Sequence, residues 1–269
     1  MLNSFILIRK IGWFVIGCII ITVVIVFSSA KSSEANADRT VNADSVEQAG
    51  KQWQQLMSIA QQWSNDNITA TVKWQGTWNT LLSPEEAAVV LTSRLGLPNA
   101  LEENVQGHSV YSSYSEVGKV YSKLTVTPQG TGMYYVMLRM ETGGSEQLTE
   151  FTELQLGYGE LLIDEGVAAH WNGALQGTAK KEIVAPNISE SSLIETIEED
   201  TVQKLSLRMK QVESYDDLGT VSRTYEIEEW PIAVFSGSHK VSLQLGVHFN
   251  SGENVYEISA GSPLLTVEY

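Results

Sequence analysis

Four stretches of the chain place apolar residues at intervals of three and four, the spacing of a helix that buries one face. The second stretch begins with Ser83-Pro84-Glu85-Glu86, which suits a helix start because it combines a serine cap, an early proline and acids in the first turn. In the third stretch, Gly157 and Gly159 lower the helix propensity without changing the period. We expect helices at residues 44–64, 83–95, 146–162 and 189–202.

Alternation of apolar and polar residues predicts strands over most of the remaining chain. The clearest case is residues 239–249, where Leu243 and Leu245 alternate with polar positions that include Gln244 and His248. We expect one face of this strand to be buried and the other to lie in water. The expected strands are residues 68–78, 108–116, 119–127, 132–142, 168–178, 205–214, 220–228, 239–249, 253–259 and 264–268.

The order of a helix, a strand, a second helix and several strands occurs twice along the chain. Two short sequence matches at similar separations support a repeat. Trp74-Gln75-Gly76 in the first strand of one half resembles Trp171-Asn172-Gly173 in the first strand of the other. Residues 113–120 resemble residues 214–221 in the same way.

We therefore interpret residues 44–143 and 144–269 as two repeats of one α+β unit. A sheet with one apolar face needs helices to cover that face. The two repeats are expected to join into one curved antiparallel sheet, with the helices on one face and the opposite face open.

The N-terminal part of the sequence predicts a membrane segment. Arg9 and Lys10 precede Ile11–Phe27, a run without charged residues. As a helix this run would rise roughly 26 Å, which is just enough to span a hydrocarbon core. Basic residues ahead of the run favour a cytoplasmic N-terminus. The chain after Phe27 is therefore expected outside the cytoplasm.

The sequence leaves open whether this segment remains as an anchor or is removed as a signal peptide. Ala35-Asn36-Ala37 fits the cleavage pattern of a signal peptide, whereas the apolar run is longer than usual for one. We assign residues 1–27 to a signal or anchor and residues 28–43, which are small and polar, to a linker. The expected location is a single-pass membrane protein with an extracytoplasmic C-terminal domain, or a secreted protein.

Composition limits the possible chemistry. The chain has 269 residues, 17 basic and 32 acidic residues, a net charge of -15 and a single cysteine. Because Cys18 is the single cysteine, a disulfide framework and a cysteine-based zinc site are excluded, and its place within the apolar run excludes thiol catalysis. Nucleic-acid binding requires lysine and arginine to neutralise phosphates. We therefore expect no nucleic-acid partner.

No sequence motif of catalysis, of metal binding or of cofactor binding is present. The spacing of the four histidines matches no metal-binding pattern, and no nucleophile elbow, P-loop or dinucleotide fingerprint occurs. His239 and His248, nine residues apart on one expected strand, would lie on opposite faces. We predict no catalytic, metal-binding or cofactor-binding residue, and no cofactor.

Neighbouring acids leave one enzymatic alternative, a carboxylate-based hydrolase of the cell envelope. A glycosidase needs two carboxyl groups across a cleft, one of them with a raised pKa. Acids that are neighbours in sequence usually diverge in space. The candidates are Glu85-Glu86, Glu102-Glu103, Glu198-Glu199-Asp200, Asp216-Asp217 and Glu228-Glu229.

Tyrosines in the strands of the first half suggest a binding surface. Tyr134 and Tyr135 are neighbours on one strand, so they point to opposite faces and at least one is expected on the open face. Exposed tyrosine suits the recognition of peptides or glycans. The candidate ligand surface consists of Tyr114, Tyr134, Tyr135, Gln244 and His248.

The chain resembles the YwmB family of Gram-positive, spore-forming bacteria. The resemblance rests on the Trp74-Gln75-Gly76 strand, the Ser83-Pro84-Glu85-Glu86 helix start, Gly107 and the Ser113-Tyr114 strand entry. It implies a fold like that of the TATA-box-binding protein, a saddle of two pseudo-symmetric halves. It does not imply DNA binding, because a fold does not determine function.

The sequence predicts a non-enzymatic binding or accessory protein of the bacterial cell envelope. Its expected partners are the membrane, through the N-terminal segment, and an envelope protein or a cell-wall ligand. A scaffold that only holds an envelope complex and the carboxylate-based hydrolase are the alternatives.

Overall fold

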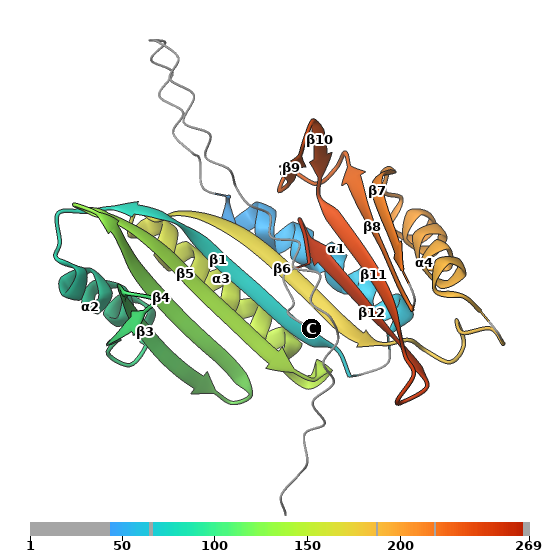
Figure 1. Ribbon diagram of the computed structural model, residues 1–269, viewed down its shortest axis with the longest axis horizontal. Coiled ribbons are helices and arrows are strands. Elements are labelled where there is room, and N and C mark those ends of the chain that lie inside the picture. The colour runs from blue at the N-terminus through green and yellow to red at the C-terminus, as the bar shows by residue number, and fades with distance from the viewer. Residues whose placement is uncertain (1–43, 65–66, 187, 218, 266–269) are drawn as a thin grey trace, which may run out of the picture. The chain divides into compact units, whose positions relative to one another are not determined.

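The computed structural model describes residues 44–64, 67–186, 188–217 and 219–265 (Figure 1). The expected membrane segment Ile11–Phe27, the cleavage pattern Ala35-Asn36-Ala37 and the linker 28–43 lie outside these residues. Within the described part, no helix has the length and the apolar composition needed to cross a bilayer.

The described residues form four α-helices and a ten-stranded antiparallel open sheet, which confirms the α+β class. The helices are α1 (Val46–Trp63), α2 (Pro84–Leu95), α3 (Leu148–Asp164) and α4 (Glu190–Leu205), with a 3-10 turn, η1 (Ser145–Gln147), before α3. The strands of the large sheet are β1 (Thr69–Asn79), β2 (Leu101–Val105), β3 (His108–Val117), β4 (Val120–Gly130), β5 (Met133–Gly143), β6 (Ala168–Thr178), β7 (Met209–Asp217), β8 (Thr220–Ile227), β11 (Leu243–Asn250) and β12 (Val255–Ser262). A separate two-stranded sheet contains β9 (Val234–Ser236) and β10 (His239–Val241).

The strand order is the same when it is read inward from either edge of the large sheet. The full order is β2-β3-β4-β5-β1-β6-β12-β11-β8-β7. From the edge to the middle, the strands of the first half are β2, β3, β4, β5 and β1. With the small hairpin β9–β10 left out, the strands of the second half are β7, β8, β11, β12 and β6 in the same direction. In both halves the second, third, fourth and fifth strands are therefore followed by the first. The first strands of the two halves, β1 and β6, pair with each other in the middle.

This order contradicts one of the two sequence matches. Residues 113–120 contain the turn between β3 and β4, whereas residues 214–221 contain the turn between β7 and β8. By position in the sheet, the counterpart of the β7–β8 turn is the β2–β3 turn. The other match does relate equivalent strands, because Trp74 lies on β1 and Trp171 on β6.

The core lies between the sheet and the helices. Helices α1 and α3 cover the middle of the sheet, α2 covers β3 and β4, and α4 covers β8 and β11 (Figure 1). Trp74 and Trp171 lie directly opposite each other on β1 and β6 and are fully buried. Trp74 Nε1 donates to the carbonyl oxygen of Gln155 on α3 at 2.9 Å, and Trp171 Nε1 donates to the Gln155 side-chain oxygen at 3.3 Å.

The helix ends follow the local sequence. Ser83 and Glu86 form a complete capping box at the start of α2, with Pro84 in the first turn. Gly96 ends this helix with a φ of 65°, a left-handed conformation that glycine adopts without strain. The expected helix start and stop at α2 are therefore confirmed.

Two strand predictions were wrong in detail. The expected strand 239–249 is interrupted at Ser242, whose N–H donates to the carbonyl of Tyr225 and whose hydroxyl accepts from the N–H of Ile227. His239 and His248 consequently lie on different strands. Strand β2 was missed, and the expected strand 264–268 is absent at Leu264 and Leu265, its remaining positions lying outside the described residues.

Two glycines of α3 provide a matched test of this packing. An added Cβ at Gly159 would overlap the indole of Trp74, whereas one at Gly157 would meet nothing within 4 Å. Gly159→Ala should lower the free energy of unfolding by about 1–3 kcal/mol through overpacking. Gly157→Ala should raise it by up to about 1 kcal/mol through helix propensity. Urea denaturation of both variants measures the difference, and equal effects would contradict the position of Trp74 against α3.

Candidate functional site: the uncovered face of the sheet

The side of the sheet that faces away from the helices is the candidate functional surface. We call it the uncovered face. Side chains alternate along each strand, so register identifies its members. On β5, the even-numbered residues from Tyr134 to Met140 are buried against the helices, and the odd-numbered residues, such as Tyr135 and Arg139, belong to the uncovered face.

Tyr114 and Tyr135 lie on this face, and their role in binding a ligand stays a prediction. Tyr114 on β3 is 51% exposed, and its hydroxyl donates to the Glu103 carboxylate at 3.4 Å. The Lys123 ammonium lies 4.9 Å from the centre of the Tyr114 ring, which is a cation–π distance. Tyr135 is half-buried, and burial raises the pKa of its hydroxyl.

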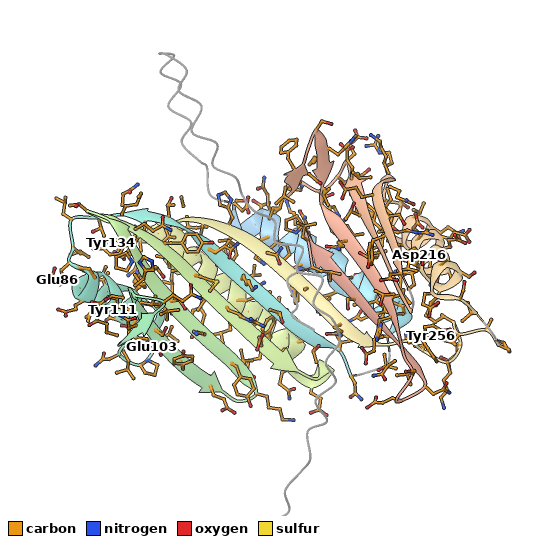
Figure 2. All side chains as sticks on the ribbon, viewed as in Figure 1. Glu86, Glu103, Tyr111, Tyr134, Asp216 and Tyr256 are labelled. Atoms are coloured by element: carbon orange, nitrogen blue, oxygen red, sulfur yellow. The ribbon has the colours of Figure 1, made fainter. Side chains whose placement is uncertain are left out.

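Tyr134 does not lie on the uncovered face, so its assignment to the candidate ligand surface was wrong. Its side chain is 2% exposed, faces the helices, and donates from its hydroxyl to the carbonyl of Leu82 at 2.6 Å (Figure 2). Its ring lies 6.1 Å from that of Trp78. Tyr134 and Tyr135 are neighbours on one strand, so their side chains point to opposite sides of the sheet. The register places Tyr134 on the helix side and Tyr135 on the uncovered face.

Gln244 and His248 lie on the uncovered face of the second half, where their polar atoms bind the chain itself. Gln244 donates to the Ser222 hydroxyl at 2.9 Å and accepts from the N–H of Leu265 at 3.1 Å. His248 Nδ1 lies 2.9 Å from the Thr220 hydroxyl. Both side chains therefore have structural partners.

The segment after β12 covers part of this second half. The Asn172 side chain donates to the carbonyl of Leu264 at 3.0 Å, and an added Cβ at Gly261 would lie 2.7 Å from Leu265. Ala174 and Ser259, both on this side of the sheet, are almost completely buried. The first half of the sheet therefore offers the more accessible surface.

The predicted surface residues do not form one site. Tyr114 lies on β3 and Gln244 on β11, with β4, β5, β1, β6 and β12 between them. Six steps between neighbouring strands correspond to roughly 29 Å. Tyr114 and Tyr135 belong to one region, and Gln244 and His248 to another.

The structure brings together three basic residues that the sequence did not single out. Lys123 on β4, Arg139 on β5 and Lys73 on β1 lie directly opposite one another on successive strands, and we call them the cationic row. Tyr114 lies opposite Lys123 at one end of the row, and Asn172 lies opposite Lys73 at the other. All three basic side chains are half-buried.

Glu141 is the acid that pairs with the centre of the cationic row. Arg139 Nε donates to the Glu141 carboxylate at 2.7 Å, and both belong to the same side of β5. The three cations are far apart in sequence, so only the strand register could show that they are neighbours. The sequence showed the alternation of polar and apolar residues along each strand, but it did not show which strands pair with each other.

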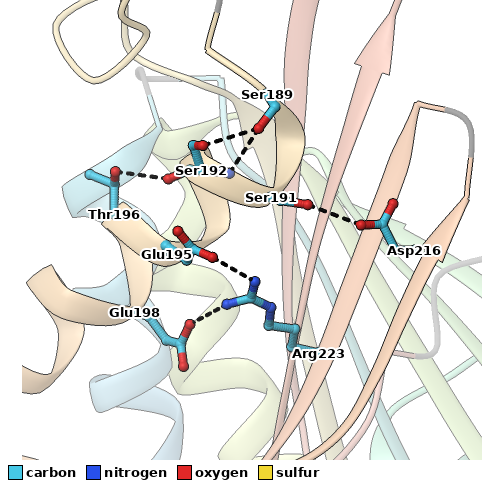
Figure 3. Close-up of polar contacts among 8 residues, drawn as sticks. All are labelled: Ser189, Ser191, Ser192, Glu195, Thr196, Glu198, Asp216 and Arg223. Carbon is cyan, nitrogen blue, oxygen red and sulfur yellow. Dashed lines mark hydrogen bonds and ion pairs between the residues drawn. The ribbon is translucent and has the colours of Figure 1, made fainter.

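Another ionic cluster has a structural role between α4 and β8. Arg223 is largely buried and contacts Glu198 at 2.6 Å and Glu195 at 3.2 Å (Figure 3). Ser191 donates to Asp216 on β7 nearby. These contacts attach α4 to the sheet, and burial raises the pKa of the neighbouring Tyr225 hydroxyl.

The acid pairs have local partners. The backbone N–H of Ser83 donates to Glu86 and lowers the pKa of that carboxyl. A hydrogen bond from Arg208 lowers the pKa of Glu229. A 10 Å³ hollow contains Asp200, and a 650 Å³ hollow along α1 contains Glu229, so neither brings acids of two pairs together. Among the described residues, no group of three or more histidines, cysteines and acids could hold a metal ion.

No protein-family model matches the chain, and no relative is found among curated proteins. The similarity to the YwmB family therefore remains a prediction from the residues quoted above.

His170, on β6, provides a pH test of the uncovered face. A hydrogen bond to Asp44 raises the pKa of His170 above its ordinary value of 6.5. A raised folded-state pKa means that the protonated histidine stabilises the fold below pH 6.5 and that this contribution is lost as pH rises through the folded-state pKa. The stability advantage of the natural chain over His170→Gln should therefore be largest in acid, as measured by urea denaturation across pH.

Asp44→Asn tests the cause. This variant keeps a hydrogen-bonding side chain and removes the negative charge. The pKa of His170, followed by its ring proton resonance, should fall relative to the natural chain. An unchanged pKa in Asp44→Asn would contradict the assigned cause.

Proposed function

We propose that this chain is a non-enzymatic binding or accessory protein of the bacterial cell envelope. Its ligand surface is the uncovered face of the first half of the sheet, around Tyr114, Tyr135 and the cationic row. The observation that carries the proposal is the contrast between the two sides of the sheet. The helix side is filled by buried apolar residues, whereas the first half of the other side presents aromatic, polar and basic side chains. A surface of this kind can bind an extended partner.

The proposed fold is a duplicated saddle like that of the TATA-box-binding protein. The identical inward strand order of the two halves, with β1 and β6 paired in the middle, supports a duplication. The resemblance to the YwmB family supports the same arrangement. The acidic composition supports a ligand other than nucleic acid.

The proposed location outside the cytoplasm rests on the apolar segment Ile11–Phe27 and the basic residues before it. A reporter enzyme fused after Tyr269, and active only when exported, tests this point. Activity is expected, and a cytosolic reporter would contradict the location.

A carboxylate-based hydrolase has weaker support. Such an enzyme needs an acid with a raised pKa opposite a second carboxylate. The resolved pKa shifts of Glu86 and Glu229 are in the opposite direction, and their partners are a helix cap and an arginine. Among the described residues, no specific observation favours this alternative.

Two exposed tyrosines in opposite halves test the proposed surface. Tyr114 on β3 and Tyr215 on β7 belong to the same side of the sheet, and each hydroxyl donates to a carboxylate. Tyr114→Ala should reduce retention of the full chain on isolated native envelope by about fivefold, because aromatic residues are frequent binding hot spots. Tyr215→Ala is the control and should leave retention unchanged. A binding assay with purified envelope measures both, and equal retention of the two variants would contradict the assigned surface.

A further inference from the structure

The two edges of the large sheet differ in how they are protected. An edge strand presents unpaired backbone groups to which another chain can bind. At one edge, β7 has a bulge between Gln211 and Glu213, and a bulge twists an edge strand away from further pairing. The Ser236 hydroxyl of β9 also donates to Glu213 at 2.8 Å. The β7 edge is therefore poorly suited to an added strand.

The opposite edge, formed by β2, is regular. Strand β2 pairs with β3 in an unbroken register from Leu101 to Val105, without a bulge. The turn between these strands has a positive φ at both Gln106 and Gly107, as a tight two-residue hairpin requires. Among the described residues, no strand pairs with the outer side of β2. Its backbone is therefore a template to which an extended chain can add.

The side chains of β2 are accessible and of two kinds. Leu101 and Val105 belong to the uncovered face and are 68% and 47% exposed. Glu102 and Glu103 lie between them and, as neighbours on one strand, point to opposite sides of the sheet. A strand added at this edge would therefore meet an apolar side chain near each end of β2 and one carboxylate on each side of the sheet.

The partners of these two carboxylates within the sheet are neutral hydroxyl groups. Ser109 donates to Glu102 at 2.7 Å, and Tyr114 donates to Glu103 at 3.4 Å. Figure 2 shows Glu103 at the outer edge of the first half. Within the described part of the chain, neither carboxylate forms an ion pair with a lysine or an arginine. Both negative charges can therefore pair with cations of a partner.

The same carboxylates disfavour a second copy of the chain as the added strand. Fully overlapped antiparallel pairing of two β2 strands would place Glu103 opposite Glu103, and a shift by one residue would place Glu102 opposite Glu103. Like charges directly opposite each other destabilise a sheet, whereas opposite charges stabilise it. The net charge of -15 also attracts a basic partner. Charge therefore favours a basic strand over a second acidic one.

We propose that the β2 edge binds an extended basic segment of a partner protein, which pairs with Leu101–Val105 as an additional strand of the sheet. Main-chain hydrogen bonds join this segment to β2. Two neighbouring lysine or arginine residues of the segment pair with Glu102 and Glu103, one on each side of the sheet. Apolar residues near its ends contact Leu101 and Val105. This inference goes beyond the proposed function, because it concerns the edge of the sheet rather than the uncovered face.

Isothermal titration calorimetry with the full chain in detergent micelles tests the charge requirement. The probe is an acetylated and amidated peptide with two neighbouring lysines between β-branched residues. Glu102→Gln/Glu103→Gln should bind it about tenfold more weakly, because two exposed charge pairs are lost. The matched control, Asp216→Asn/Asp217→Asn, removes two neighbouring acids from the other edge strand and should leave the affinity unchanged. Equal weakening by both variants would overturn the proposal, since it would show only a general attraction between charges.

Charge reversal separates lost recognition from lost folding. Glu102→Lys/Glu103→Lys should no longer bind the lysine peptide and should bind a peptide in which glutamates replace both lysines. The natural chain should not bind the glutamate peptide. Both changes are at the sheet edge, so the melting temperature should stay close to that of the natural chain. A reversed variant that binds neither peptide, or that still binds the lysine peptide, would overturn the proposal.

Two methylated forms of the lysine peptide test the pairing of main chains. The N–H groups of neighbouring residues in a strand point to opposite sides, so only one of the two lysines directs its N–H toward β2. N-methylation of that lysine should weaken binding about tenfold, whereas N-methylation of the other lysine should have little effect. Equal affinities of the two methylated peptides would overturn the addition of a strand.

Discussion

The pairing of β1 with β6 is the interaction on which the rest of the structure depends. It joins the first strands of both halves, and Trp74 and Trp171 face each other across it beneath Gln155 of α3. Gly159 leaves the space that the Trp74 indole fills. Without this pairing each half would expose a sheet edge with unsatisfied backbone groups. The shared sheet and the shared indole contacts therefore stabilise each other.

This central pairing also bears on the proposed ligand surface. The helices that cover β1 and β6 bury one side of the sheet, so the proposed ligand surface is on the other side. The two halves use that side differently. In the second half, Asn172 and Gln244 bind the segment that contains Leu264 and Leu265. In the first half, the same side presents tyrosines and the cationic row. A symmetrical framework therefore has an asymmetrical surface.

The sequence predicted the elements better than their pairing, for physical reasons. Helix periods and caps are local, so the four helices could be predicted, and alternation revealed strands with one buried face. Strand β2 was missed because neither of its faces is buried and alternation is absent. The break at Ser242 depends on hydrogen bonds to Tyr225 and Ile227 and has no local signal. Alternation showed that the side chains of Tyr134 and Tyr135 point to opposite sides of the sheet, but only the register of the strands shows which one is buried. The three basic residues of the cationic row are neighbours only because of this register.

The acidic composition and the cationic row act over different distances. At physiological ionic strength the Debye length is about 8 Å, so a ligand far from the surface is affected mainly by screened net charge. The row itself extends over roughly 10 Å, and its attraction is effective only near contact. Long-range steering by the row is therefore weak, and association depends on short-range fit.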